Sequence, residues 1–187
     1  MHVMKPKAAR KASPSWSHVK ARLTDFERAG LLGLVQALYE ASKDNQAFLH
    51  ARFALGGDVL KPYKVTIDRW LWPDVFKNQD TSVAKAKKAI SDYKWAIGRP
   101  DGLAELMVFY CERASGFSAD IGFQDDGYFD ALVRMFEQSL KMITALPTTQ
   151  QPALWARLTK VRCISDDFGY GVSNDMDELL AEYGVDG

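Results

Sequence analysis

The sequence predicts an all-α fold of about seven or eight helices in antiparallel pairs, arranged as an irregular bundle or a short helical-repeat-like stack. Apolar residues recur every three or four positions along most of the chain, which is typical of amphipathic helices. Glycine and proline interrupt this pattern at helix-length intervals, and no segment shows sustained period-two alternation. The chain has 187 residues, of which 47% are apolar, enough for one sizeable core.

Two regions are expected from composition. Residues 1–15 are rich in Lys, Ala, Pro and Ser and predict a disordered basic N-terminal tail, whereas residues 16–187 predict a single helical domain. No apolar run approaches the roughly 20 residues that span a bilayer, and no apolar segment follows the basic start, so no membrane association is expected. Two cysteines do not make a disulfide framework in a chain of this length, which favours a reducing, cytoplasmic location.

Four helices are expected in the first half of the chain, mostly opened by capping residues and closed by glycine or proline. The first begins at the capping box Thr24-Asp25-Phe26-Glu27, in which the threonine and glutamate side chains satisfy free amides. The expected limits are residues 24 to 42 for the first, Gly56-Gly57 as the end of the second, 58 to 73 for the third and 82 to 98 for the fourth.

Four more helices are expected in the second half. The fifth opens at Pro100 or Asp101 and ends at Gly116, where a loop over residues 116–124 begins. The sixth starts at Asp125, whose carboxylate complements the helix dipole, runs to Pro147, and is expected to be the longest. The seventh carries apolar residues from 154 to 161, and a short eighth is expected to be capped by Asn174 and to run through Leu180.

A row of lysines marks the expected fourth helix. At about 100° per residue, Lys87 and Lys94 fall on one line beside the apolar stripe, with Ser91 between them and Trp95 off the core side. Ammonium groups beside an aromatic ring can hold phosphate or carboxylate, and a ring can stack on a base. The Lys85–Lys94 helix and the basic tail therefore allow a nucleic-acid-associated accessory protein, although a solvated basic face explains the same pattern.

An enzyme acting on a small molecule or phosphate ester is a further alternative. It would bring Lys87, Lys94, Arg52 and Glu112 together in one pocket. No residue is assigned a catalytic role, none of the three histidines has metal-ligand spacing, and no cofactor is implied. Tyr170, between two glycines, could cover a pocket or simply anchor a connector between helices.

Aromatic content favours a third function. Five tryptophans and seven tyrosines are many for one small domain, and aromatic residues are enriched at binding surfaces. The best functional hypothesis is a non-enzymatic helical protein-interaction module that binds a protein partner or forms a homo-oligomer. Its candidate binding residues, taken with the anionic-ligand patterns above, are Arg52, Lys87, Ser91, Lys94, Trp95 and Tyr170.

Several short motifs resemble those of an uncharacterised bacterial all-helical family known only as a domain of unknown function. The resemblance covers roughly residues 20–180 and implies a small bacterial helical protein, without any activity, ligand or catalytic residue. The motifs that carry it are Leu38-Tyr39-Glu40, Phe48-Leu49, Arg52-Phe53, Tyr63, Ala89-Ile90-Ser91-Asp92-Tyr93-Lys94, the stretch from Leu103 to Glu112, and Gly169-Tyr170-Gly171.

Overall fold

A computed structural model describes residues 13–53, 55 and 57–184, and these residues are helical with no β-strand. Nine α-helices lie within them, where the sequence predicts seven or eight; the additional one is α1 (Trp16–Leu23). Most of the expected tail, residues 1–12, and the expected helix stop at Gly56 lie outside the described residues. Within the described ranges, no helix combines the length and apolar content needed to cross a bilayer.

Contacts divide the chain into two compact units, residues 1–46 and residues 47–187, and each is described by itself. The single domain expected over residues 16–187 stays a prediction. The first unit contains α1, α2 (Arg28–Ala41) and the start of α3 (Lys43–Arg52).

The capping box predicted at Thr24 is wrong. Thr24 lies at the C-terminal end of α1, where its hydroxyl donates a 2.7 Å hydrogen bond to the carbonyl of Ala21. The next helix begins only at Arg28, after Glu27. The threonine hydroxyl is thus bonded to the helix that precedes it, so it does not cap the helix that follows.

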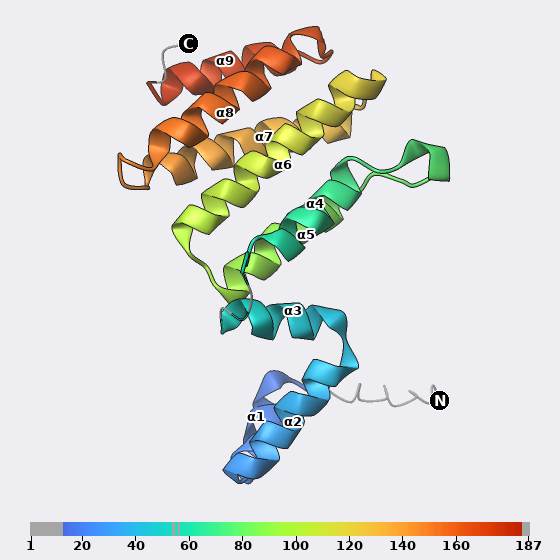
Figure 1. The fold of residues 1–187 in the computed structure, drawn as a ribbon, viewed down its shortest axis with the longest axis vertical. Coiled ribbons are helices and arrows are strands. Elements are labelled where there is room, and N and C mark those ends of the chain that lie inside the picture. Colours follow the sequence, from blue (N-terminus) through green and yellow to red (C-terminus); the bar gives the residue numbers. More distant parts are fainter. Residues whose placement is uncertain (1–12, 54, 56, 185–187) are drawn as a thin grey trace, which may run out of the picture. The chain divides into compact units, whose positions relative to one another are not determined.

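Four α-helices of the second unit, α4, α5, α8 and α9, pack around α6 and α7 (Figure 1). Figure 1 shows α4 on one side of α6 and α8 on the other, so the three form a row; α6 also packs on α7, and α7 packs on α9. The elements after α3 are α4 (Lys61–Leu71), the 3-10 turn η1 (Val75–Lys77), α5 (Val83–Ala96), α6 (Pro100–Ile121), α7 (Asp126–Thr144), α8 (Gln151–Ile164), the 3-10 turn η2 (Ser165–Asp167) and α9 (Val172–Glu182).

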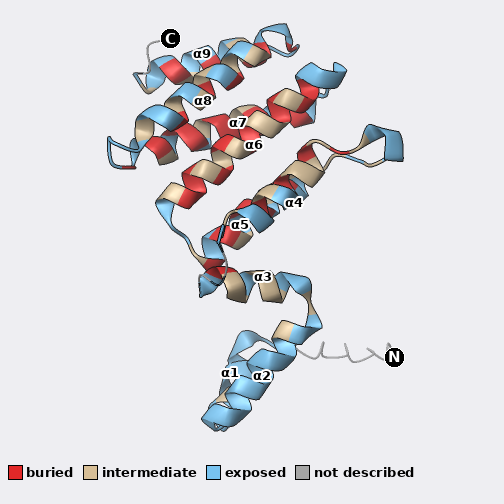
Figure 2. Cartoon of the chain, in the orientation of Figure 1, coloured by how far each residue is buried: buried red, intermediate tan, exposed pale blue. Residues whose placement is uncertain are grey.

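The core of this unit lies mainly between α6 and α7, which carry much of the buried surface in Figure 2. Leu106 and Phe117 on α6 are almost completely buried, as are Leu132 and Phe136 on α7. Buried positions on α7 recur at helical spacing along one face, whereas those on α6 extend around most of the helix and leave Glu105 and Glu112 on the partly exposed remainder. Packing fixes α6 firmly and therefore positions these polar side chains.

Gly116 does not end a helix, contrary to the sequence-based prediction. Instead α6 continues to Ile121 and ends at Gly122, which has a positive φ of 66°, so α6 (22 residues) is longer than α7 (19 residues). A β-carbon at Gly116 would lie 2.5 Å from Cζ3 of Trp72. The glycine at this position allows the indole to approach the helix backbone closely, which is a packing requirement rather than a stop signal.

Candidate functional site

The lysines expected to form a basic row on α5 have different surroundings. Lys87 is half-buried, and burial together with the nearby positive charge of Arg134 lowers the pKa of its ammonium group. Lys85 lies with its Nζ 3.7 Å from the centre of the Trp70 ring. Two of the α5 lysines are therefore occupied by packing against other helices, and this weakens the basic row as a phosphate-binding surface.

Other candidates on α5 are more accessible. Lys94 and Ser91 are exposed, but the Ser91 hydroxyl donates to the backbone carbonyl of Lys87 in its own helix, at 3.3 Å. Trp95 is 83% exposed. Arg52 on α3 donates from Nη1 to the carbonyl of Ala96 at 3.3 Å, so this arginine lies at the C-terminal end of α5, where a cation complements the helix dipole.

Tyr170 lies in the loop between η2 and α9 and is 62% exposed. Its φ of 60° is uncommon for a residue other than glycine. The ring contacts Phe129 at the start of α7, with 5.9 Å between centroids, and the adjacent Gly169 amide donates to Oε1 of Gln124 at 3.0 Å. These contacts anchor the loop to α7, and none of the contacts found in the described chain joins Tyr170 to the α5 candidates.

An ion-pair network crosses the row of α4, α6 and α8, and the sequence did not reveal it. Arg157 on α8 donates to both oxygens of Glu112 at 2.7 Å and, through Nη1, to Oε2 of Glu105 at 2.5 Å. The other oxygen of Glu105 accepts from Lys64 Nζ on α4 at 2.6 Å. Three helices are thereby joined through four side chains that are each 24 to 33% exposed.

The charge states of this network follow from its geometry. Burial raises the pKa of Glu105, but hydrogen bonds from Arg157 and Lys64 outweigh that effect, and the net pKa is lowered. Hydrogen bonds to Glu112 are the largest cause that raises the pKa of Arg157. Both groups are therefore held in their charged forms at neutral pH. Glu112, which one hypothesis grouped with Lys87, Lys94 and Arg52, is held by α8, and the described contacts do not bring it to those residues.

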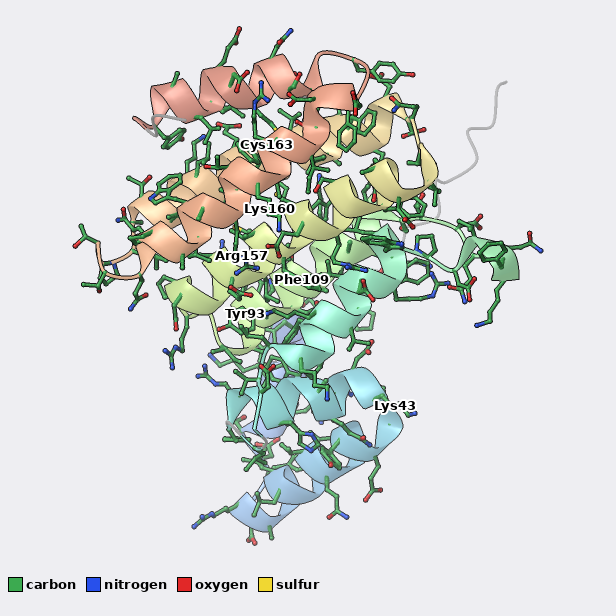
Figure 3. The ribbon with its side chains drawn as sticks, turned by 45° about the horizontal axis from the view of Figure 1, so that its top comes forward. Lys43, Tyr93, Phe109, Arg157, Lys160 and Cys163 are labelled. Carbon is green, nitrogen blue, oxygen red and sulfur yellow. The ribbon has the colours of Figure 1, made fainter. Side chains whose placement is uncertain are left out.

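An open groove lies beside this network, between α4 and α6, with a volume of about 300 Å³. On α4 the lining positions recur at intervals of three and four, and on α6 they are four apart, so each set occupies one helix face. Figure 3 labels Phe109 on α6 and Arg157 and Lys160 on α8. The residues that line the groove are Asp58, Lys61, Lys64, Val65, Asp68, Phe109 and Arg113.

Arg113 is the most constrained cation in the groove. Its guanidinium carbon lies 4.0 Å from the centre of the Trp72 ring, and Nε lies 2.5 Å from Oδ1 of Asp68. Nε and that oxygen are buried and are not aligned as a hydrogen bond, so the contact is electrostatic. The stacked ring and the carboxylate together fix the plane of the guanidinium.

The first unit carries a different kind of surface. No residue of α1 or α2 is buried, and both helices are mostly exposed in Figure 2. On α2, Leu32 is 62% and Leu38 is 51% exposed. At about 100° per residue, Leu31, Leu34, Val35 and Leu38 fall within an arc of about 100°, and Leu32 extends it. These five side chains form the α2 apolar face, and all of them are exposed.

No group of three or more His, Cys, Asp and Glu side chains within the described ranges is arranged to hold a metal ion. Comparison of the chain with known protein families, with curated proteins and with solved structures finds no match.

Proposed function

We propose that this chain is a non-enzymatic helical interaction module that self-associates through the α2 apolar face. The observation that carries the proposal is that five large apolar side chains lie along one helix whose own unit buries none of them. Contiguous exposed apolar surface of this kind marks interaction sites. A second copy of the chain presents the same face, so a two-fold arrangement would bring apolar surface against apolar surface.

Burial of the face would supply a useful driving force. Covering a Leu or Val side chain contributes about 1.5–3 kcal/mol, so the exposed part of these five contributes on the order of 5 kcal/mol per copy. Two copies would gain about twice that, comparable with the cost of about 4–15 kcal/mol for association. The expected dimer is therefore reversible and depends on protein concentration.

The second unit would act as the scaffold in this proposal. Its successive helices α4 and α5, α6 and α7, and α8 and α9 pack on each other, and we propose that they are antiparallel pairs stacked in a repeat-like manner. Nucleic-acid binding by α5 is the weaker alternative. Lys88 pairs with Asp92 at 2.6 Å and Lys85 lies against Trp70, so fewer cations remain for phosphates.

The test is the double substitution Leu32→Glu with Leu38→Glu, measured by sedimentation velocity from about 1 to about 200 µM protein. Glutamate has nearly the helix propensity of leucine, so α2 should still form while its apolar face gains charge. We expect the wild type to shift from monomer to dimer across this range and the variant to stay monomeric. Circular dichroism checks that both have the same helix content.

Phe76→Glu is the matched control, because Phe76 is 96% exposed but lies on η1 in the second unit. It should associate as the wild type does. A wild type that remains monomeric at every concentration would refute self-association, and equal loss of the dimer in the Phe76 variant would show that α2 is not the docking element.

A further inference from the structure

The groove between α4 and α6 has charges that its own contacts leave unbalanced. Lys64 is paired with Glu105 at 2.6 Å, and Asp68 is in contact with Nε of Arg113. Oδ1 of Asp58 accepts from the backbone amide of Leu60 at 2.9 Å. Asp68 is therefore in contact with a cation, and Asp58 has a backbone donor but keeps its negative charge.

Two cationic side chains that line the groove, Lys61 and Arg113, differ from these paired groups. Within the described residues, the ammonium of Lys61 has no hydrogen bond or ion pair, and the two terminal nitrogens of Arg113 have no hydrogen bond. Trp72 and Asp68 hold the Arg113 guanidinium from its face and from its Nε edge. Its terminal edge is thus a fixed pair of donors, and a planar pair of donors matches the two oxygens of a carboxylate.

The remaining wall of the groove is apolar. Val65 is exposed on α4, and the half-buried ring of Phe109 on α6 lies 5.3 Å from Lys64 Nζ. A ligand that places a carboxylate at Arg113 or Lys61 can therefore rest an apolar side chain on Val65 and Phe109. An open groove along two helices suits an extended chain better than a small molecule, since small ligands favour enclosing cavities.

We propose that this groove binds an extended peptide segment in which acidic and apolar side chains alternate. Arg113 receives one carboxylate through its two terminal nitrogens, Lys61 receives a second, and an apolar side chain between them contacts Phe109. A few spaced carboxylates are favoured over the phosphates of a nucleic acid, because Asp58 and Asp68 border the groove and repel a dense run of negative charge more strongly than isolated charges placed at Arg113 and Lys61.

This inference adds a second interaction surface to the proposed function and does not depend on the α2 apolar face. Fluorescence anisotropy of the full chain would measure binding of a labelled peptide of repeated Glu-Leu-Glu-Phe-Gly units. The same peptide with Gln in place of Glu tests the need for charge, and single-stranded oligothymidine tests phosphate. Repeating the titrations with the Leu32→Glu and Leu38→Glu variant separates peptide binding from self-association.

We expect the Glu peptide to bind at least about tenfold more tightly than the Gln peptide or the oligonucleotide. Lys61→Gln should weaken binding about threefold or more, and Arg113→Lys about tenfold, because lysine keeps the charge but loses the planar pair of donors. Lys160→Gln is the matched control, since Lys160 is exposed on α8 but does not line the groove, and it should leave affinity unchanged.

Equal binding of the Glu and Gln peptides, or no binding of either, would overturn the proposal. Tighter binding of the oligonucleotide would replace peptide by nucleic acid as the ligand class and would equally overturn it. Arg113→Lys could lower the melting temperature strongly, and its loss of binding would then not identify the site. The exposed Lys61→Gln variant decides in that case: if it binds the Glu peptide as tightly as the wild type does, the assigned site is wrong.

Discussion

Substitution of Arg157 by Met tests whether the ion-pair network stabilises the row of α4, α6 and α8. Methionine has a similar length and is apolar, so the change removes the charge and five donors while filling much of the same space. Glu112 then loses both of its charged hydrogen bonds, and Glu105 keeps only its contact with Lys64. Two half-buried carboxylates are left without the cation that links α8 to α6.

The expected magnitude lies between two known limits. Removing one partner of a fully buried ion pair costs about 3–5 kcal/mol, whereas an exposed pair contributes about 0–1 kcal/mol. Arg157 is 30% exposed and its partners are 24 and 33% exposed, so solvent screens part of the interaction. We expect a loss of about 2 kcal/mol in the free energy of unfolding, or a fall of about 4–8 °C in melting temperature.

The loss should depend on pH in a defined direction. Burial raises the pKa of Glu105 but its hydrogen bonds lower it further, so its pKa in the folded protein lies below the ordinary value of 4.5. A depressed carboxyl pKa stabilises the fold at pH values above the unfolded pKa, and this contribution is lost as pH falls through the folded pKa. The difference between wild type and Arg157→Met should thus be largest near pH 7 and shrink below about pH 4.5.

Urea unfolding followed by circular dichroism at neutral and acidic pH measures both effects. Arg134→Met is the control, because Arg134 pairs with Asp130 on the surface of α7, where the two side chains are 69 and 61% exposed. It should change stability by no more than about 0.5 kcal/mol. The reasoning is refuted if Arg157→Met resembles this control at pH 7, or if its stability deficit grows as the pH is lowered.

Two further substitution or reactivity tests address the core of the second unit. Gly102→Ala places a β-carbon 1.9 Å from the Tyr93 hydroxyl oxygen, and the Tyr93 side chain is buried. We therefore expect the free energy of unfolding, measured by urea titration, to fall by about 1–3 kcal/mol. A variant more stable than the wild type would contradict this. Burial raises the pKa of the Cys111 thiol to about 12, despite its contact with Ser139, while Cys163 is exposed. A thiol reagent should therefore modify one cysteine in the native protein and the second only after unfolding, and rapid reaction of both would show the burial to be wrong.

Apolar spacing and capping residues predicted most helices, but some predicted helix ends are wrong. Apolar spacing indicated eight helices that are present, although α1 was missed because it has only eight residues, too few to show a sustained apolar stripe. Thr24 and Gly116 have the residue types of a helix start and a helix stop. Their actual roles depend on the groups they contact. Thr24 bonds to the Ala21 carbonyl, and Gly116 packs against the Trp72 ring, which lies far away in sequence.

For the candidate sites too, the sequence placed residues on helices but did not show which residues of other helices they contact. The sequence located Lys87, Lys94 and Trp95 correctly on one helix, yet it could not show that Lys87 is half-buried and that the charge of Arg134 lowers its pKa. Glu105 and Glu112 lie seven residues apart, which already places them on one face of a helix. Nothing local could pair them with Arg157, which follows Glu112 by 45 residues along the chain.

The sequence by itself determined that this protein is helical, because a helix depends on side-chain spacing and on backbone hydrogen bonds between residues four apart. Only the tertiary structure decided which polar faces meet. Packing α6 between α4 and α8 brings Lys64, Glu105 and Arg157 together and leaves the groove beside them. It also showed that the apolar stripe of α2, which periodicity assigned to a core, is not buried within its own unit.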